Sequence, residues 1–442
     1  MKVLTKSPPS EPVVERIPLT RLQRIYRRLF VRSLQTLQYG QILLDEPYLK
    51  EVSSLGSATG GGPVVSLEIR SPEFYKDVVL RGSLGAGEAW TAGIWDTSDL
   101  EGLIRIMLRN RDVLDGLEQG PARLAAWVLR WLDNRNANSK TGSRRNIAAH
   151  YDLGNEFYRL FLDRNMMYSS AIYPTADSTL EEASRYKNER VCRKLGLRPG
   201  LRVLEIGTGW GGFALHAAGE HGCHVTTTTL SRQQFELARA RVAEADLQDL
   251  IDVRLQDYRD LQGRFDRIVS IEMIEAVGYQ YLDTYFERCA KLLTTQGRML
   301  VQGITVPEWA WERHKRSVDF MKHYIFPGCS LISIGGVSGA LAGTNLRWEN
   351  LEDIGPHYAR TLQDWRRRFH LRIHDVKRLG FDQHFLRMWD FYLASCEAAF
   401  TERYTSAVQI LLARGADRSP SLLPLLPEPR GRNRRDTADL ST

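Results

Sequence analysis

A glycine-rich turn between an apolar run and a helix-forming run constrains this sequence more than any other feature. Residues 203–206 are apolar or strand-forming, the motif GTGWGG follows at 207–212, and residues 213–218 have the composition of a helix. This order predicts a buried strand, a tight turn and the start of a helix. Glycines let the backbone approach a ligand closely, and the first N–H groups of a helix are unpaired. The turn is therefore predicted to be a cofactor cradle.

Strand-like and helix-like segments alternate around this turn. Five further segments have strand character: residues 224–230, 251–255, 265–271, 298–304 and 347–353. Helical segments are expected at residues 179–195, 232–245, 281–293, 307–321, 361–379 and 385–400. The alternation predicts an α/β fold with a doubly wound, Rossmann-like parallel sheet and helices on both faces. In such sheets ligands collect at the carboxyl ends of the strands, where the strand order reverses.

Polar residues at these strand ends distinguish between cofactor classes. A dinucleotide site usually places Asp or Glu near the end of the second strand, whereas this chain has Thr229, Leu230 and, slightly later, Gln234. The turn also reads GxGxGG instead of GxGxxG, which disfavours a nicotinamide dinucleotide. The third strand ends at Gln256 and Asp257. For Asp257 the alternative role is a helix cap.

Length and composition limit the class of protein. A chain of 442 residues allows about two or three domains. Its net charge of +7 favours an anionic partner, either nucleic acid or an anionic membrane surface. The sequence has no uncharged apolar run of about 18 residues, so no transmembrane helix is predicted. Its N-terminus has no apolar signal core, so export is not expected. The five cysteines are scattered without a CxxC pair, which predicts reduced thiols in a cytosol and no zinc site or disulfide framework.

Composition shifts divide the chain into five parts. We expect a flexible lead at 1–16, a smaller α+β, lipid-associated domain at 17–133, a polar linker at 134–145, the sheet domain at 146–415 and a disordered basic tail at 416–442. Within the first domain, residues 64–69 alternate like a strand. The stretch GSLGAGEAW at 82–90 lacks the lysine of a phosphate-binding loop, and its glycines predict a turn-rich element.

A basic amphipathic helix is predicted at residues 21–32. Leu22, Ile25 and Leu29 recur at helical spacing, and arginines occupy another face. Such a helix either docks on its own domain through the apolar stripe or contacts a membrane, and the sequence leaves both alternatives open.

Several motifs, in the same order along the chain, resemble the cyclopropane-fatty-acid synthase family of S-adenosylmethionine-dependent methyltransferases. They run from about residue 80 to about residue 410: GSLGAGEAW, NIAAHYDLGNEFYRLFLD, MMYSSAIY, VLEIGTGWGG, TTLSRQQ, LQDYRD, IEMIEAVG and YIFPG. The resemblance implies methyl transfer from the sulfonium of S-adenosylmethionine to the cis double bond of an unsaturated fatty acyl chain, usually in a phospholipid, giving a cyclopropane. In the family a bound bicarbonate is the base.

The resemblance also implies roles for individual residues. Those matched to the cofactor site are Tyr168, Ser169, Gly207, Gly209, Thr229, Leu230 and Gln234, beside the strand-end residues Gln256 and Asp257. Glu275 matches the glutamate that holds the bicarbonate, Tyr358 the tyrosine that supports it, and Ile304 a backbone contact.

Two positions depart from the family's pattern. Ser170 stands where the family usually has Cys, and Gln302 where it has His in the shell of the anion. Glutamine offers a donor and an acceptor but cannot become a cation, so an anion would lose a charge-assisted hydrogen bond. A changed base site can change how the carbocation resolves. The alternative products are a methylene- or methyl-branched acyl chain.

The resemblance places the protein in the cytoplasm, peripheral on the inner face of the membrane, with an unsaturated phospholipid or fatty acyl substrate and an anionic membrane surface as partners. A homodimer is compatible with the sequence. Nucleic acid is not expected, because the Asn/Asp-Pro-Pro-aromatic loop of base-flipping methyltransferases is absent and the fourth strand is followed by EMIEAV. A catalytically silent lipid-binding relative is the third class considered.

Overall fold

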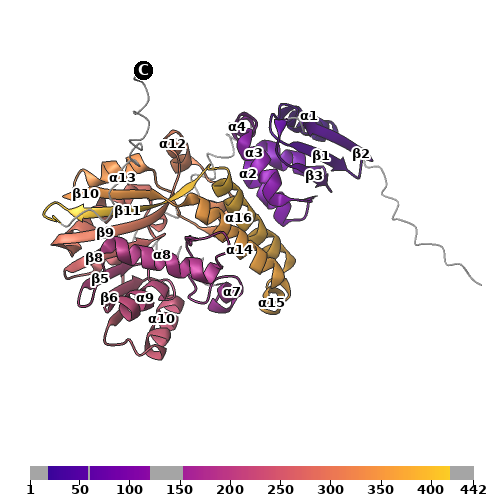
Figure 1. Ribbon diagram of the computed structural model, residues 1–442. Coiled ribbons are helices and arrows are strands. Elements are labelled where there is room, and N and C mark those ends of the chain that lie inside the picture. Colours follow the sequence, from indigo (N-terminus) through magenta and orange to yellow (C-terminus); the bar gives the residue numbers. More distant parts are fainter. Residues whose placement is uncertain (1–17, 58–59, 120–152, 419–442) are drawn as a thin grey trace, which may run out of the picture.

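The computed structural model describes residues 18–57, 60–119 and 153–418, and it has the predicted α/β fold with a smaller N-terminal part (Figure 1). The predicted lead and linker lie outside the described residues, as does the predicted tail from residue 419. Asp417 lies just inside the predicted tail, yet it is buried and pairs with Arg298 at 2.7 Å. The part of the chain that packs on the domain therefore extends at least to Asp417.

A seven-stranded sheet forms the centre of the larger part. Its strands are β5 (Arg202–Ile206), β6 (His224–Thr229), β7 (Ile251–Leu255), β8 (Phe265–Ile271), β9 (Leu293–Thr305), β10 (Leu346–Asp353) and β11 (Ser406–Arg414). Their order is β10-β11-β9-β8-β5-β6-β7. Strands β5 to β9 run parallel, whereas β11 is antiparallel to both β9 and β10. Because β5 lies between β6 and β8, the strand order reverses there and places the switch point at the glycine turn.

Helices cover both faces of this sheet, as the alternation predicted. Helices α8 (Leu180–Leu195), α9 (Gly212–His221) and α10 (Arg232–Glu244) cover one face, and α11 (Leu282–Leu292) and α13 (Ile334–Leu341) the other. Successive strand residues supply the two cores: Val203 packs with α8 and α9, and Leu204 packs with α11. This alternation is the expected consequence of a strand buried on both sides.

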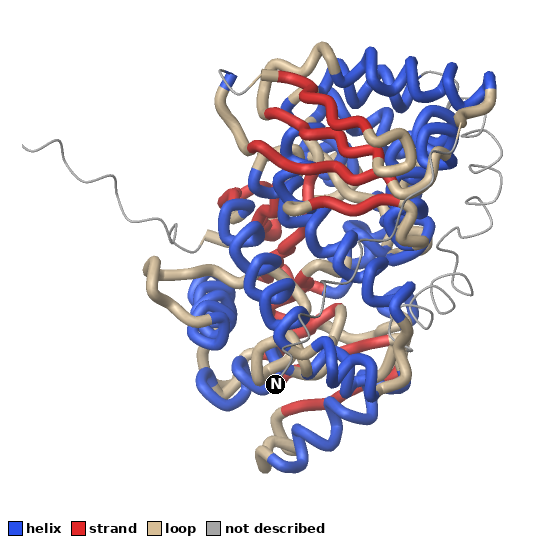
Figure 2. Tube along the Cα trace, turned by 90° about the vertical axis from the view of Figure 1, so that its right-hand side faces the viewer, coloured by secondary structure: helices blue, strands red, loops and turns tan. Residues whose placement is uncertain are grey.

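The smaller N-terminal part has a four-stranded sheet, whose strands lie side by side in Figure 2. Its elements are α1 (Arg21–Leu34), β1 (Gln41–Glu46), β2 (Glu51–Gly56), β3 (Val64–Ile69), α2 (Glu73–Thr91), β4 (Trp95–Thr97), α3 (Leu100–Arg109) and α4 (Arg111–Gln119). The sheet order is β2-β1-β3-β4, with β1 and β3 parallel and the other pairs antiparallel. The strand expected at 64–69 is confirmed.

The stretch GSLGAGEAW is a helix, and the expectation of a turn-rich element was wrong. It forms the second half of α2, which is kinked at Gly82 with a positive φ of 56°. The later glycines permit close packing: a Cβ on Gly87 would lie 2.4 Å from the Phe320 ring and 2.9 Å from Phe391. Glycine therefore serves here as a small helix residue beneath an aromatic contact.

Helix α16 (Gln383–Thr401) lies between the two parts of the molecule (Figure 1). The indole Nε1 of Trp90 in α2 donates to the carbonyl of Arg387 at 2.9 Å, and the guanidinium of Arg387 donates to the carbonyl of Trp95 at 2.8 Å. The other flank of α16 packs on α14 (Gly355–Leu371) through rings such as Trp389 and Phe369. The N-terminal part is thus hydrogen-bonded to the domain that holds the large sheet.

Two expected helices differ in extent from the prediction, and one strand was not expected. The helix expected at 307–321 is α12 (Glu308–Arg316), and a π-helical turn, Met321–Ile325, follows after a short break. The helix expected at 361–379 begins earlier, as α14, and is interrupted at Arg372 before α15 (Ile373–Arg378). Strand β11 was not predicted. No helix in the described ranges is long and apolar enough to cross a membrane.

Candidate functional site

The glycine turn connects β5 to α9 and adopts backbone conformations that suit glycine. Gly207, Gly209 and Gly211 have positive φ values of 103°, 52° and 86°. Side chains rarely tolerate this region, and a Cβ on Gly207 would also lie 3.2 Å from Met273. The N–H groups of Gly207 and Thr208 both donate to the carbonyl of Thr228, which ties the turn to β6.

One cavity opens at the carboxyl ends of the strands beside this turn. All nine residues predicted to bind the cofactor line it: Tyr168, Ser169, Gly207, Gly209, Thr229, Leu230, Gln234, Gln256 and Asp257. Further lining residues were not predicted; they include Glu205, Trp210, Tyr258, Glu272 and Met273. The cavity therefore brings together the loop before α8 and the ends of β5, β6, β7 and β8, as a switch-point site requires.

The end of β6 lacks a carboxylate, in agreement with its sequence. The Thr229 hydroxyl donates to Oε1 of Gln234 at 2.8 Å, and the Ser231 side chain caps α10. The lining does contain a buried acid in the neighbouring strand, Glu205 in β5, which accepts from the Thr227 hydroxyl at 2.6 Å. Burial raises the pKa of Glu205 to about 8. A single carboxylate inside an otherwise apolar strand was the signal that could have identified it.

Asp257 lines the cavity and also caps a short helix. Its Oδ1 accepts from the backbone N–H of Arg259 at 2.9 Å and caps the short helix Tyr258–Asp260. The Arg259 guanidinium also pairs with this carboxylate, at 2.7 Å. Only about 2% of the Asp257 side chain is exposed, and the ion pair with Arg259 fixes the orientation of this carboxylate in the wall of the cavity.

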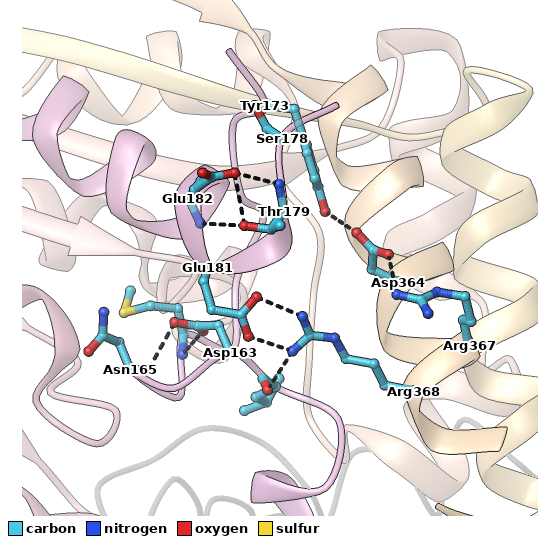
Figure 3. Close-up of polar contacts among 12 residues, drawn as sticks. Asp163, Asn165, Tyr173, Ser178, Thr179, Glu181, Glu182, Asp364, Arg367 and Arg368 are labelled. Carbon is cyan, nitrogen blue, oxygen red and sulfur yellow. Dashed lines mark hydrogen bonds and ion pairs between the residues drawn. The ribbon is translucent and has the colours of Figure 1, made fainter. Parts of the chain in front are cut away.

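Hydrogen bonds hold the segment that carries Tyr168 and Ser169 in place. Asp163 accepts from the backbone N–H groups of Asn165 and Met167 at 2.9 and 2.8 Å (Figure 3). Nearby, the two oxygens of Glu181 accept from the two Nη atoms of Arg368, each at 2.8 Å, which joins the first turn of α8 to α14 (Figure 3). Arg368 also donates to the carbonyl of Leu162. These contacts fix the loop that faces the glycine turn.

A carboxylate cluster lies next to the cavity, centred on the half-buried Glu272, which directly follows β8. Oε1 of Glu272 accepts from the N–H of Ser170 and from Nε2 of Gln302, both at 2.8 Å. Oε2 accepts from the hydroxyl of Tyr358 at 2.6 Å. Three residues that the resemblance assigned to the anion site therefore converge on a glutamate of the chain itself. Ser170 takes part through its backbone, because its hydroxyl donates to the carbonyl of Ala171.

The backbone at Glu272 has a positive φ of 49°, which is unusual for a residue with a side chain. Such a conformation costs about 1–3 kcal/mol and is found most often at functional sites. Burial raises the pKa of Glu272, and the hydrogen bonds from Tyr358, Gln302 and Ser170 oppose that rise. The carboxyl is thus a stronger proton acceptor than an ordinary surface glutamate.

A chain of amides orients Gln302. Its Oε1 accepts from Nε2 of Gln409 in β11 at 3.0 Å, so its own NH₂ group is turned toward Glu272. Oε1 of Gln409 in turn accepts from the Lys194 ammonium at 2.9 Å, and Lys194 pairs with Glu352 at 2.5 Å. Gln302 and Gln409 are both fully buried and face each other in the β9–β11 register.

Glu275 lies one turn further along and has a different environment. Its Oε1 accepts from the N–H of Ile304 at 2.5 Å, while its Oε2 has no hydrogen-bond partner among the described residues. Burial, followed by repulsion from Glu272, raises the pKa of Glu275 to about 8. Glu275 does not line the cavity, whereas Glu272 does. Glu275 and Ile304 were each predicted for the bicarbonate site, and here they contact each other beside the Glu272 cluster.

Lys187 supplies the nearest buried positive charge. Its ammonium donates to the hydroxyl of Ser169 at 3.2 Å. Burial lowers the pKa of Lys187 to about 8, and the carboxylates of Glu272, Asp163 and Glu205 oppose that fall. Lys187 and Glu272 were missed as site residues by sequence reasoning. Glu272 directly follows a predicted strand, and this position at the switch-point edge was the available signal.

Aromatic rings enclose the same region. Tyr358 stacks on Phe400 with ring centroids 4.4 Å apart, and the Tyr168 ring lies 5.3 Å from Trp365. The hydroxyls of Tyr168 and Tyr392 are 2.8 Å apart. An apolar, aromatic environment of this kind accommodates hydrocarbon, and ring faces attract a cation.

Comparison with known proteins gives a consistent result. The family model described as mycolic acid cyclopropane synthetase matches residues 138–410. The chain is 37% identical to tuberculostearic acid methyltransferase UfaA1 of Mycobacterium tuberculosis over 83% of this chain and 88% of that protein. It is 33% identical to the cyclopropane-fatty-acyl-phospholipid synthase of Escherichia coli K12 over 83% and 92% of the two chains.

A solved structure shares both the fold and the sequence. Mycolic acid cyclopropane synthase CmaA1, complexed with SAH and CTAB, superposes with a TM-score of 0.58 at 29% identity, over 61% of this chain and 98% of that one. The similarity covers the part of the chain that carries the glycine turn and the carboxylate cluster.

Proposed function

Because the chain belongs to the mycolic acid cyclopropane synthetase family, whose members here are S-adenosylmethionine-dependent fatty acyl methyltransferases, we propose that it acts on the cis double bond of an unsaturated acyl chain in a phospholipid, with Glu272 as the proton acceptor. The observation that supports this proposal is the convergence of Ser170, Gln302 and Tyr358 on Glu272 at the edge of the cavity.

The residues of the cavity fit S-adenosylmethionine. Gly207 and Gly209 give the backbone room for the donor, and the Thr229–Gln234 pair and Asp257 offer acceptors for ribose hydroxyls. Bound there, S-adenosylmethionine supplies an electrophilic methyl group. The π electrons of the alkene form the new C–C bond, the C–S electron pair stays on sulfur, and the second alkene carbon becomes a cation.

Glu272 then accepts one proton from the new methyl group. An ionised carboxylate beside a carbocation is attracted to it, and burial strengthens this attraction. The donors of Ser170, Gln302 and Tyr358 that would hold a bicarbonate already bind Glu272, and two adjacent carboxylates, the half-buried Glu272 and the buried Glu275, would repel another anion. The residues present therefore do not fit bicarbonate, and the proposed reaction has no step through it.

Two products follow from the same cation. If the methyl C–H electron pair attacks the cationic carbon as the proton leaves, a cyclopropane forms. If a hydride first moves from the methyl-bearing carbon to the cationic one, the cation becomes tertiary, and loss of the methyl proton gives a methylene branch. A carboxylate tethered by three hydrogen bonds cannot follow the cation as a small ion can, which allows time for the hydride shift. We therefore favour the methylene-branched product and keep the cyclopropane as the second candidate.

Product identification tests this proposal. Purified protein, S-adenosylmethionine and vesicles of an oleoyl phospholipid should give acyl esters that gain one CH₂ by mass spectrometry. Proton NMR separates the isomers, because a methylene branch has vinylidene protons and a cyclopropane has upfield ring protons. Tight binding of S-adenosylmethionine without a mass gain on any cis-unsaturated lipid would instead identify a catalytically silent relative.

Helix α1 supports an anionic membrane as the partner surface. The helix docks through Phe30 and Leu34, which are buried, whereas Leu22, Ile25 and Leu29 are 63%, 53% and 45% exposed. The apolar stripe therefore does not dock on its own domain. Four exposed arginines flank it, and the helix contains no acidic residue: Arg21, Arg24, Arg28 and Arg32. Such a face suits the interface of an anionic bilayer.

Sedimentation with vesicles separates a membrane partner from nucleic acid. We expect the protein to sediment with anionic but not with neutral vesicles, and to release RNA at moderate salt. Replacing Leu22, Ile25 and Leu29 together with Ser should abolish sedimentation; retained binding would contradict the role of α1. A peripheral site on the inner, cytoplasmic face is the location that this proposal implies. The oligomeric state, including a homodimer, can be measured in the same preparation.

A further inference from the structure

A cluster of potential metal ligands lies away from the cavity, between α8 and α9. The ligand atoms of Cys192 in α8 and of His216 and His221 in α9 all lie within 4.8 Å of one another. The Nε2 atoms of His221 and His216 are 3.0 and 3.4 Å from the same oxygen, Oε2 of Glu189. Three potential ligand atoms therefore lie close together, and a carboxylate oxygen adjoins the two imidazoles.

We propose that this cluster binds a zinc ion through Cys192, His216, His221 and Glu189. Zinc prefers four ligands of the thiolate, imidazole and carboxylate types, at about 2.0–2.3 Å in tetrahedral geometry. Ligand atoms around such an ion are about 3.3–3.8 Å apart, so the cluster needs to contract by about 1 Å on binding. Small side-chain rotations supply such a change.

The simpler interpretation is a hydrogen-bonded group around Glu189. Arg193 donates to Oε1 of this carboxylate at 2.6 Å, and the two imidazoles contact Oε2. That interpretation does not account for Cys192, a fully buried thiol whose sulfur faces both imidazoles. Arg193 is 72% exposed and can release the carboxylate into water at little cost. Zinc binding uses all four side chains.

The ligand types and their accessibility are suited to a metal. Imidazole nitrogens and a cysteine thiolate are ligands that zinc prefers, and coordination of Cys192 would release the thiol proton. The side chains of His216 and His221 are 12% and 18% exposed, which leaves a path for the ion from solvent.

The proposed ion would have a structural role. All four ligands come from the protein, so no coordination position is left for a substrate. Helix α9 begins at the glycine turn, and α8 carries Lys187, which binds Ser169 in the cavity. Zinc would therefore hold together α8 and α9, the two helices next to the cofactor site. The expectation of no zinc site rested on the absence of CxxC pairs, a pattern that does not cover ligands from two helices.

Metal binding to the full-length, untagged protein tests the proposal. Protein freed of metal by a chelator is mixed with zinc chloride, passed through gel filtration and analysed for metal. We expect about one zinc per chain, a higher melting temperature, and, with cobalt chloride in place of zinc, a thiolate-to-cobalt absorption band in the near ultraviolet.

Variants distinguish the site from adventitious binding. Cys192→Ser should lower zinc affinity at least about tenfold and remove the cobalt band, and His221→Gln, at a partly exposed position, should have a similar effect on affinity. Cys223→Ser, a buried thiol outside the set, is the matched control and should retain the metal. No retained zinc in the wild type, or equal retention in Cys192→Ser and His221→Gln, would overturn the proposal.

Discussion

The glycine turn and the Glu272 cluster lie on the same edge of the sheet, yet they are built in different ways. The turn is a backbone structure, set by the positive φ values of Gly207, Gly209 and Gly211 within one short stretch. The cluster is mainly a side-chain structure: three side chains come from the residue after β8, from β9 and from α14, and the loop at Ser170 contributes a backbone N–H. Backbone sites are specified locally, whereas a side-chain network exists only once distant elements have packed together.

Removal of the Glu272 carboxylate should have the largest effect. Glu272→Gln keeps the size of the side chain but loses the proton acceptor, and general-base catalysis typically contributes about 10²–10⁴-fold. We expect kcat to fall by about a thousandfold while S-adenosylmethionine affinity, measured by calorimetry, stays close to wild type. Loss of both together would mean that the two regions are not separable in the way described.

The wild-type pH profile provides a second readout of the same carboxyl. Because burial raises the pKa of Glu272, the base is protonated, and activity is lost, as the pH falls through a value above the ordinary glutamate range. A single-turnover rate that stays constant as the pH falls to about 4.5 would exclude this carboxyl as the base.

A substitution in the glycine turn should lower the affinity for S-adenosylmethionine and leave the fate of the cation unchanged. Gly207→Ala forces a side chain into a left-handed conformation and toward Met273, which costs about 1–2 kcal/mol and lowers donor affinity about tenfold or more. The ratio of methylene to cyclopropane product should not change. Gly219→Ala is the matched control, since that glycine lies in α9 with only ordinary contact to Leu247. A changed product ratio in Gly207→Ala alone would connect the turn to the fate of the cation.

Glu275→Gln should have a smaller catalytic effect than Glu272→Gln, about tenfold, because Glu275 does not line the cavity and its contact to Ile304 can be kept by the amide oxygen. Its pKa of about 8 means that the folded state holds a proton that the unfolded state releases. The contribution of this group to stability is therefore present below about pH 4.5 and is lost as the pH rises through about 8. Denaturation at pH 6 and pH 8 should show a weaker pH dependence in Glu275→Gln.

Gln409→Leu is expected to have the smallest effect on rate. It leaves the buried Oε1 of Gln302 without its donor, which costs about 1–3 kcal/mol of stability. A freely turning amide holds Glu272 less firmly, so kcat should fall only a few-fold while the product ratio shifts toward the cyclopropane. An unchanged product ratio would show that Gln409 has only a structural role.

The sequence predicted the cofactor cavity more fully than it predicted the Glu272 cluster. The strand ends and the family resemblance together named nine of the residues that line the cavity, and Tyr168 and Ser169 came from the resemblance alone. Glu272 and Glu275 are three residues apart, and only the packing of α14 and β9 against β8 determines which one receives the hydrogen bonds of Tyr358 and Gln302.

Two elements of the fold were also not predicted correctly from the sequence. Strand β11 was missed because a continuous apolar run does not distinguish a buried strand from a buried helix. The glycines of α2 were interpreted as turn residues, since their use in packing against Phe320 depends on a segment more than two hundred residues away.

The dependence of turnover on bicarbonate tests the central claim most directly. Reactions are run with oleoyl phospholipid vesicles in degassed buffer free of carbon dioxide, with and without millimolar bicarbonate. If Glu272 is the proton acceptor, wild-type turnover is the same in both buffers, and only Glu272→Gly, which opens the space of the carboxylate, gains activity on adding the ion. Wild-type turnover that requires bicarbonate would contradict the account.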